Sequence, residues 1–324
     1  MGTVVYWFDP PKAQRMKHKI ILDCDPGHDD AIAILLAAHH PEIDLLAITT
    51  VAGNQSLEKT TRNALKVCSL ADIHDVPVAR GMDRPLVRPA KHAPDIHGES
   101  GMDGPHIPEP TIEAAPRHAV DLLIDLLMNS DGDITLVPTG PLTNIAAAIR
   151  QQPAIVPKIK AISLMGGAIG LGNVTPAAEF NIHTDPEAAA IVFACGRPIT
   201  MVPLEVTHQA LATPEVTARL RAAQHPVASF VADLLVFFAS TYHKVFGFPA
   251  APLHDPCAVA AVIDPTIIRA HMMHVEIETA GEWTSGRTVC DVYAKLGKEP
   301  NARVGYALEV ERFWDMVIST ILSY

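Results

Sequence analysis

The sequence predicts an α/β protein with an open, mostly parallel sheet flanked by helices, built on a Rossmann-like core. Short apolar runs typical of buried strands alternate along the chain with longer segments typical of helices. The connections between successive strands are long enough for parallel crossovers, which place the loops after the strands at one edge of the sheet. Ligands bind at that edge in open α/β sheets, so we expect the chemistry in those loops.

The first half of the chain gives the clearest elements. The apolar run KIILDCD is followed by a P-G-H-D-D turn and an apolar segment of helical length, which predicts a strand and then a helix. Strands are expected at 19–25, 44–54, 76–81 and 133–140. Helices are expected at 31–40, 57–71, 117–129 and 141–152, the last with Pro141 near its first turn.

The second half is predicted in less detail. Strands are expected at 160–168 and 198–207, with a helix at 185–196 that Gly196 ends. A helix-rich stretch follows residue 208, with strands near 274–279 and 287–293 and a final helix from about 309. Loop-rich stretches at 82–116 and 166–184 interrupt the pattern. No linker divides the chain, so we expect one domain over 17–324, preceded by an extension at 1–16 outside the core fold.

Composition excludes several classes of protein. The chain has 324 residues, 48% of them hydrophobic, which is enough for a sizeable core. Its formal charge of −11 without a basic stripe argues against a nucleic-acid polymer as partner. The longest apolar run, 31–38, is short of the roughly 20 residues of a membrane span, so no membrane partner is expected. Five scattered cysteines without a C-x-x-C pair favour a reducing, cytoplasmic setting.

Four carboxylates, those of Asp23, Asp25, Asp29 and Asp30, lie within eight residues where the first strand ends and the first helix begins. Asp29 and Asp30 alone could be helix-start residues, whose negative charge the helix dipole stabilises. Adding Asp23 and Asp25 packs like charges together in a partly buried loop, which predicts a bound cation. Hard carboxylate oxygens suit Ca²⁺ or Mg²⁺ rather than zinc. Asp255, followed by Pro256, is either a helix N-cap or a further ligand.

A set of motifs points to a family. The stretch ILDCDPGHDDAIAILLA (21–37) resembles the D-x-D-x-G-x-D-D signature of the calcium-dependent nucleoside hydrolases, the inosine–uridine-preferring type and its bacterial ribonucleoside hydrolase relatives. Further stretches resemble that family's other motifs in the same order: TTVAGN (49–54), IHGESGMDG (96–104), VPTGPLTNIA (137–146), MGG (165–167), EFNIHTDPEAA (179–189) and HDP (254–256). The resemblance covers essentially the chain from Lys17 onward.

The resemblance implies an N-ribosyl hydrolase that releases free base and ribose from ribonucleosides, and a homotetramer or dimer. It implies one Ca²⁺ per subunit, held by Asp25, Asp30, Asp255 and the backbone carbonyl of Thr139. It also implies ribose contacts from Asp29, Asn54, Asn173, Glu179 and Asn181, and two histidines, His97 and His254, beside the nucleobase.

Hydrolysis of an N-ribosidic bond passes through an oxocarbenium-like sugar, so the enzyme must stabilise positive charge, activate a water and assist the leaving base. We expect Asp25 to be the general base for a Ca²⁺-positioned water. His254 is the preferred group for protonating the base, because an ordinary histidine pKa of about 6.5 lets it carry a proton near neutrality. Tyr242 lies on a predicted helix that could reach the base, although core packing explains it as well.

Two alternatives belong to other classes. Asp23 and Asp25 form a D-x-D after the first strand, as in aspartyl phosphatases of the haloacid dehalogenase type, but Pro26 and Gly27 follow and the Asp29–Asp30 pair is left unexplained. A non-catalytic nucleoside- or ribose-binding protein has no need for carboxylates around a cation, and such receptors usually carry a signal segment, which we do not recognise here.

Overall fold

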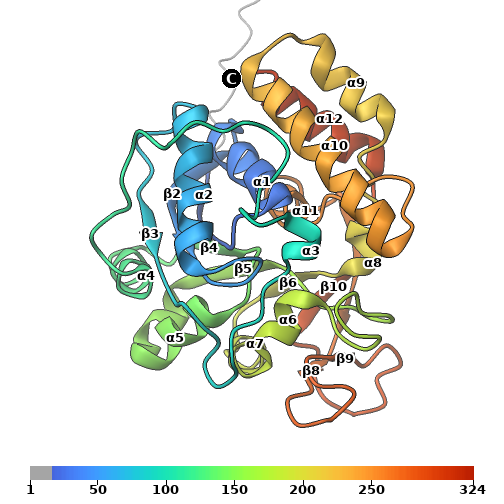
Figure 1. Ribbon diagram of the computed structural model, residues 1–324. Coiled ribbons are helices and arrows are strands. Elements are labelled where there is room, and N and C mark those ends of the chain that lie inside the picture. The colour runs from blue at the N-terminus through green and yellow to red at the C-terminus, as the bar shows by residue number, and fades with distance from the viewer. Residues whose placement is uncertain (1–16) are drawn as a thin grey trace, which may run out of the picture.

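The computed structural model describes residues 17–324, in which helices cover both faces of an eight-stranded sheet (Figure 1). The expected extension at 1–16 lies outside the described residues. The strand order is β3-β2-β1-β4-β5-β6-β10-β7, and every neighbouring pair is parallel except β10 with β7. This confirms the predicted open, mostly parallel sheet. The strands are β1 His18–Cys24, β2 Ile43–Thr50, β3 Val78–Arg80, β4 Ile134–Pro138, β5 Ile159–Met165, β6 Ile199–Val202, β7 Ile268–Met273 and β10 Ala302–Leu308.

Two hydrophobic cores lie on opposite faces of the sheet. Because successive side chains of a strand point to opposite faces, Ile20 and Leu22 of β1 belong to one core and Ile21 to the other. The helices are α1 His28–His39, α2 Leu57–Leu70, α3 Pro94–His97, α4 Ala119–Met128, α5 Thr143–Gln151, α6 Phe180–Thr184, α7 Pro186–Phe193, α8 Leu204–Thr207, α9 Pro214–Ala222, α10 Pro226–Phe246, α11 Pro256–Ile263 and α12 Val310–Ile321, with a 3₁₀ segment η1 at Pro153–Lys158. Helix α1 packs against α2, α11 and α12 on one face, and α5 packs against α4 and α7 on the other.

The predicted strand at 198–207 was too long. Strand β6 ends at Val202, and Pro203 precedes the short helix α8. Proline has no N–H for the strand ladder, which explains why the strand stops there. The predicted strands near 274–279 and 287–293 exist as β8 Val275–Ile277 and β9 Thr288–Cys290, but they pair only with each other, outside the main sheet.

Strands β7 and β10 were missed. Both lie at one end of the main sheet, where β10 pairs in parallel with β6 and antiparallel with β7. Their sequences, IRAHMM and ARVGYAL, lack a continuous apolar run, and four of the six residues of β7 are not buried. Their strand conformation depends on partners far away in the sequence rather than on local periodicity.

Within residues 17–324, α10 is the one helix with the length and mean hydropathy of a membrane span, 21 residues and 1.2. Half of it is buried against the rest of the fold, including α9, α3 and α1, as expected for the core helix of a globular protein. Composition alone is therefore weak support for a membrane span.

Candidate active site

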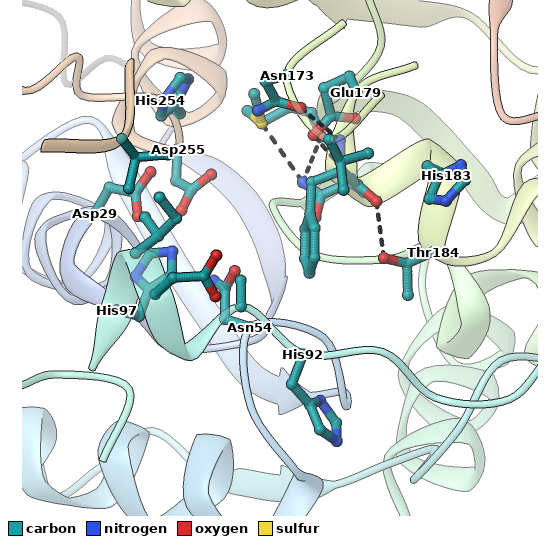
Figure 2. Close-up of a pocket in the computed structure, with 18 of the residues that line it drawn as sticks. Asp29, Asn54, His92, His97, Asn173, Glu179, His183, Thr184, His254 and Asp255 are labelled. Carbon is teal, nitrogen blue, oxygen red and sulfur yellow. Dashed lines mark hydrogen bonds between the residues drawn. The ribbon is translucent and has the colours of Figure 1, made fainter. Parts of the chain in front are cut away.

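A cavity of about 280 Å³ opens at the carboxyl edge of the sheet. Figure 2 shows Asp29 and Asp255 close together on one side, with Asn173 and Glu179 across from them. The predicted site residues that line it are Asp29, Asn54, His97, Thr139, Asn173, Glu179, Asn181, Tyr242, His254 and Asp255. Asp25 and Asp30 lie behind this wall, fully buried and in contact with Asn54. The structure thus gathers residues from 25 to 255 around one space.

Asp25 follows β1 and is enclosed by backbone. Its Oδ2 accepts a 2.6 Å hydrogen bond from the backbone N–H of Asn54, while its Oδ1 is buried without a hydrogen-bond partner. A Cβ on Gly53 would come within 2.0 Å of the Asp25 carboxylate, so only glycine allows this approach. Burial, followed by the charge of Asp30, raises the pKa of Asp25 well above its usual value.

Asp29, Asp30 and Asp255 offer carboxylate oxygens that all lie within 4.8 Å of one another. Asp30 does serve the helix start, because its Oδ2 accepts from the N–H of Gly27 at 3.0 Å, but its Oδ1 accepts from the Thr139 hydroxyl at 2.9 Å. Asp255 precedes α11 yet makes no capping hydrogen bond. The N-cap interpretation therefore does not account for the side chain of Asp255, which faces the other two carboxylates.

The donor set fits a hard cation. The unpartnered Asp25 Oδ1 and the three clustered carboxylates supply oxygen ligands without a cysteine, and buried carboxylates at this spacing repel unless a positive charge joins them. The Thr139 carbonyl accepts from the Asn181 amide at 2.7 Å and keeps a second lone pair. The cluster can therefore bind a metal ion.

Without a cation, the protein is expected to lose stability as pH rises from 5 to 8. Burial raises the pKa of Asp29 and of Glu179 to about 7, whereas carboxyls in unfolded chains titrate at about 4. The folded state thus keeps protons that the unfolded state releases, and the free energy of unfolding falls across this window. Thermal melts of chelator-treated protein check the slope, which Glu179→Gln should reduce. A melting temperature independent of pH would contradict it.

The wall opposite the carboxylates comes from 166–184. Glu179 caps α6, with Oε1 accepting from the N–H of Asn181 and Oε2 from those of Gly167 and Ile182. Asn181 donates its amide to the Thr139 and Met165 carbonyls. Its Oδ1 has no hydrogen-bond partner among the described residues and can accept from a ligand in the cavity. The Asn173 Oδ1 accepts from the Phe180 N–H, which leaves the Asn173 amide group for a ligand.

His254 is held between two hydroxyls. Its Nε2 lies 2.7 Å from the Tyr242 hydroxyl and its Nδ1 2.7 Å from the Thr207 hydroxyl. Burial, helped by His208, lowers the pKa of His254 well below 6.5, so the imidazole is neutral near pH 7. The expectation of an ordinary histidine pKa was therefore wrong, because the sequence does not reveal how deeply the ring is buried. Tyr242 keeps its proton, since burial raises the pKa of its hydroxyl.

His97, on α3, contacts His28 from the signature turn. The two Nδ1 atoms lie 3.3 Å apart, and the backbone N–H of His28 lies 3.4 Å from the same His97 Nδ1. Burial lowers the pKa of His28 to about 4 and that of His97 well below its usual value. Both rings are therefore neutral near pH 7.

Sequence reasoning missed several residues of the site. Further lining residues include Met165, Phe180, His183, Thr184, Phe238, Lys91 and His92. Most come from the two long loops, where position in the fold rather than periodicity decides which side chains reach the cavity. The loops themselves were expected to carry chemistry, which is the one signal that could have found these residues.

Asp23 does not face the cavity. Its Oδ1 accepts from the Thr49 hydroxyl at 2.5 Å and the Asn144 amide at 2.7 Å, behind the sheet edge. A substrate in the cavity could not reach it, because it is fully buried and does not line that space. The phosphatase alternative, which needs this carboxylate as a nucleophile, is therefore not supported.

Known proteins resemble this chain along nearly its whole length. The inosine-uridine preferring nucleoside hydrolase family matches residues 20–315. The pyrimidine-specific ribonucleoside hydrolase RihB of Escherichia coli strain K12 is 50% identical over 308 residues, covering 95% of this chain and 98% of that protein. A purine-preferring ribonucleoside hydrolase from Gardnerella vaginalis has a TM-score of 0.88 at 36% identity, covering 94% of this chain and 98% of that one. A plant nucleoside hydrolase, PpNRh1, has a TM-score of 0.88 at 32% identity, covering 95% and 99%.

These matches agree with the motifs and with the cavity they surround. The predicted activity, hydrolysis of the N-glycosidic bond of ribonucleosides, is confirmed at the level of the family, and the chain is an N-ribosyl hydrolase. It belongs to the inosine–uridine preferring nucleoside hydrolase family.

Proposed function

We propose that this enzyme hydrolyses pyrimidine ribonucleosides such as uridine, with Ca²⁺ as its cation and Asp25 as its general base. The observation that carries the proposal is a single cavity with clustered carboxylates on one wall and Asn173, Glu179 and Asn181 on the other. The pyrimidine preference is supported by the name of the 50% identical relative, which is pyrimidine-specific.

Asp25 is suited to accept a proton from water. The N–H of Asn54 orients Oδ2 and leaves Oδ1 unpartnered, so Oδ1 has one lone pair for the cation and another for a proton of the water. In the protein without a cation, burial raises the pKa of Asp25 above that of an exposed carboxylate. We propose that Asp25, Asp30, Asp255 and the Thr139 carbonyl hold the cation. When bound, Ca²⁺ would supply positive charge that orients water and the ribose hydroxyls and lowers their pKa.

The ribose is proposed to lie between the two walls. Asp29, Asn54, Asn173, Glu179 and Asn181 would bind its hydroxyls, and the carboxylates among them would stabilise positive charge developing on the sugar. Hydrogen bonds to the hydroxyls that strengthen as the ring flattens would favour the transition state over the bound nucleoside. A ribonucleoside should therefore be preferred over its 2′-deoxy form.

The leaving base is proposed to be protonated from the side of Tyr242 and His254. Tyr242 lines the cavity and its hydroxyl is 2.7 Å from His254 Nε2, so a proton on that nitrogen would reach the base through this hydroxyl. Burial keeps most His254 neutral near pH 7, so its small protonated fraction would supply this proton, and that form is a strong acid. His97 lines the same cavity and is the second candidate donor.

Products identify the reaction. Incubation with uridine should release uracil and ribose in equal amounts, whereas a binding protein would return the nucleoside intact. Uridine and cytidine should be turned over faster than inosine. The absence of free ribose with every common ribonucleoside would refute the proposed function.

Uridine 5′-monophosphate should be a poor substrate. The cavity wall carries Asp29, Glu179 and Asp255, and its one lysine among the described residues, Lys91, is exposed at the rim. A phosphate would meet like charge there, so we expect kcat/KM at least about tenfold below that of uridine. Steady-state kinetics on the two substrates check this, and equal values would contradict it.

We also propose that residues 17–324 act as one domain, that the enzyme works in the cytoplasm, and that it forms a homotetramer or dimer. All five cysteines are free, which supports a reducing compartment. Light scattering on the purified protein tests the oligomeric state.

A further inference from the structure

His28 lies directly behind His97 but does not line the cavity. It occupies the first position of α1 and is fully buried. Its Nε2 lies 2.8 Å from the backbone carbonyl of Asp103, and its Nδ1 lies 3.3 Å from His97 Nδ1. His97 in turn lines the cavity, and its Nε2 has no hydrogen-bond partner among the described residues. The two rings therefore form a chain that runs from a loop carbonyl to the substrate space.

The hydrogen-bond partners decide where the protons lie. A carbonyl oxygen can only accept, so His28 Nε2 carries the hydrogen, and the Nδ1 of a neutral His28 is an acceptor. In a hydrogen bond between the two rings His97 Nδ1 therefore donates, which leaves the lone pair of His97 on Nε2 and excludes the 3.4 Å hydrogen bond from the His28 backbone N–H to the same Nδ1. The opposite arrangement, in which His97 Nδ1 accepts the longer contact from the His28 N–H, would set two lone pairs 3.3 Å apart.

We propose that His28 is a positioning residue that holds His97 in its Nδ1–H tautomer, with Nε2 as the nitrogen available to the substrate. The proposal deepens the proposed function and rests on it. Any proton that His97 gains is then added to Nε2, on the side of the leaving base. When that Nε2–H bond breaks, the proton passes to the base and the Nδ1–H remains with His28.

Close packing fixes the position of the two rings. A Cβ on Gly27 would come within 2.4 Å of His97 Nδ1, so this glycine lets α3 approach the signature turn. The His28 ring also stacks on Phe237 and Phe238, with centroids 5.2 and 5.1 Å away. If His28 acted only through this stacking, a phenylalanine could replace it. If it acts through hydrogen bonds, a phenylalanine could not.

Two variants separate these roles. His28→Phe keeps an aromatic ring for stacking and removes both hydrogen bonds, whereas His28→Gln loses the ring and keeps one donor and one acceptor. We expect His28→Phe to lower kcat on uridine about 10–100-fold and His28→Gln to stay within about threefold of wild type. On p-nitrophenyl riboside, whose leaving group needs no proton, both should stay within about threefold.

The tautomer can be read in the wild-type enzyme. Nitrogen-15 NMR of histidine-labelled protein, with His97 assigned by the signal lost in His97→Asn, should give the Nδ1–H tautomer. In His28→Phe the ring can no longer accept from His97 Nδ1, and only the backbone N–H of residue 28 remains beside that nitrogen. His97 Nδ1 then accepts from this N–H, so the tautomer should reverse to Nε2–H. This measurement needs no substrate and decides the proposal even if His28→Phe fails to fold.

Three results would overturn the proposal: an Nε2–H tautomer in wild type, a loss on uridine as large in His28→Gln as in His28→Phe, or equal losses in His28→Phe on both substrates. If wild type hydrolyses neither uridine nor the activated riboside, the proposed function fails, while the tautomer measurement still decides the role of His28.

Discussion

Replacing Asp25 by asparagine is expected to lower the turnover of uridine about 10²–10⁴-fold, the range that a general base contributes. Asparagine preserves the size of the side chain and can still accept the 2.6 Å hydrogen bond from Asn54 through its Oδ1. It cannot accept a proton from water at the position of the unpartnered carboxylate oxygen. Steady-state kinetics on uridine at saturating Ca²⁺ measure the loss, because weaker cation binding is then compensated.

The same variant should be at least as stable as wild type when both lack the cation. Asp25 is fully buried and lies beside Asp30, and the two effects together raise its pKa well above the usual value. Removing a buried charge among like charges relieves repulsion, so the melting temperature should not fall. Asp75→Asn, at an exposed position outside any helix or strand, is the control and should change neither turnover nor stability. A turnover within about tenfold of wild type, or about 1.4 kcal/mol, would exclude Asp25 as the base.

Replacing Asp255 by asparagine is expected to weaken Ca²⁺ binding more than about 100-fold. Loss of a residue that only hydrogen-bonds to a metal ligand costs roughly 10–100-fold in affinity, and Asp255 is proposed to be a ligand itself. The Asp255 carboxylate lies within 4.8 Å of those of Asp29 and Asp30 and makes no helix cap. The substitution therefore removes a charged ligand of the cation and leaves the cap of α11 unchanged.

Activity separates the roles of Asp255 and Asp25. Turnover of Asp255→Asn should recover in large part as Ca²⁺ is raised, since this residue binds the ion and does not accept the proton. Turnover of Asp25→Asn should stay low at every Ca²⁺ concentration. Calorimetric titration gives the affinity of each variant, and an unchanged affinity in Asp255→Asn would contradict its place in the cation site.

The first half of the fold could be predicted because each element carries its own signal. From β1 through the P-G-H-D-D turn into α1, the apolar segments are bounded by turn residues. The observed ends of β1 and α1 lie within a few residues of the predicted ends. Strand β10 could not be predicted, because a sequence interrupted by Arg303 and Gly305 becomes a strand only through its pairing with β6 and β7.

The site divides in the same way. The carboxylates stood out as a cluster of like charges that needs a counter-ion, and the family motifs connected Asp255 to them. The pairing of His28 with His97 and the position of His254 between two hydroxyls could not be predicted, because they depend on contacts between residues far apart in the chain. Burial also sets the pKa of His254, and no local pattern encodes how deeply that ring is buried.

The most direct test of the central claim is a Ca²⁺ titration of the chelator-treated enzyme, with the release of ribose from uridine measured at each point. Activity should be absent without the ion, rise in proportion to bound Ca²⁺ and reach its maximum at one equivalent per chain. Full release of ribose by enzyme shown to contain no divalent ion would contradict the account.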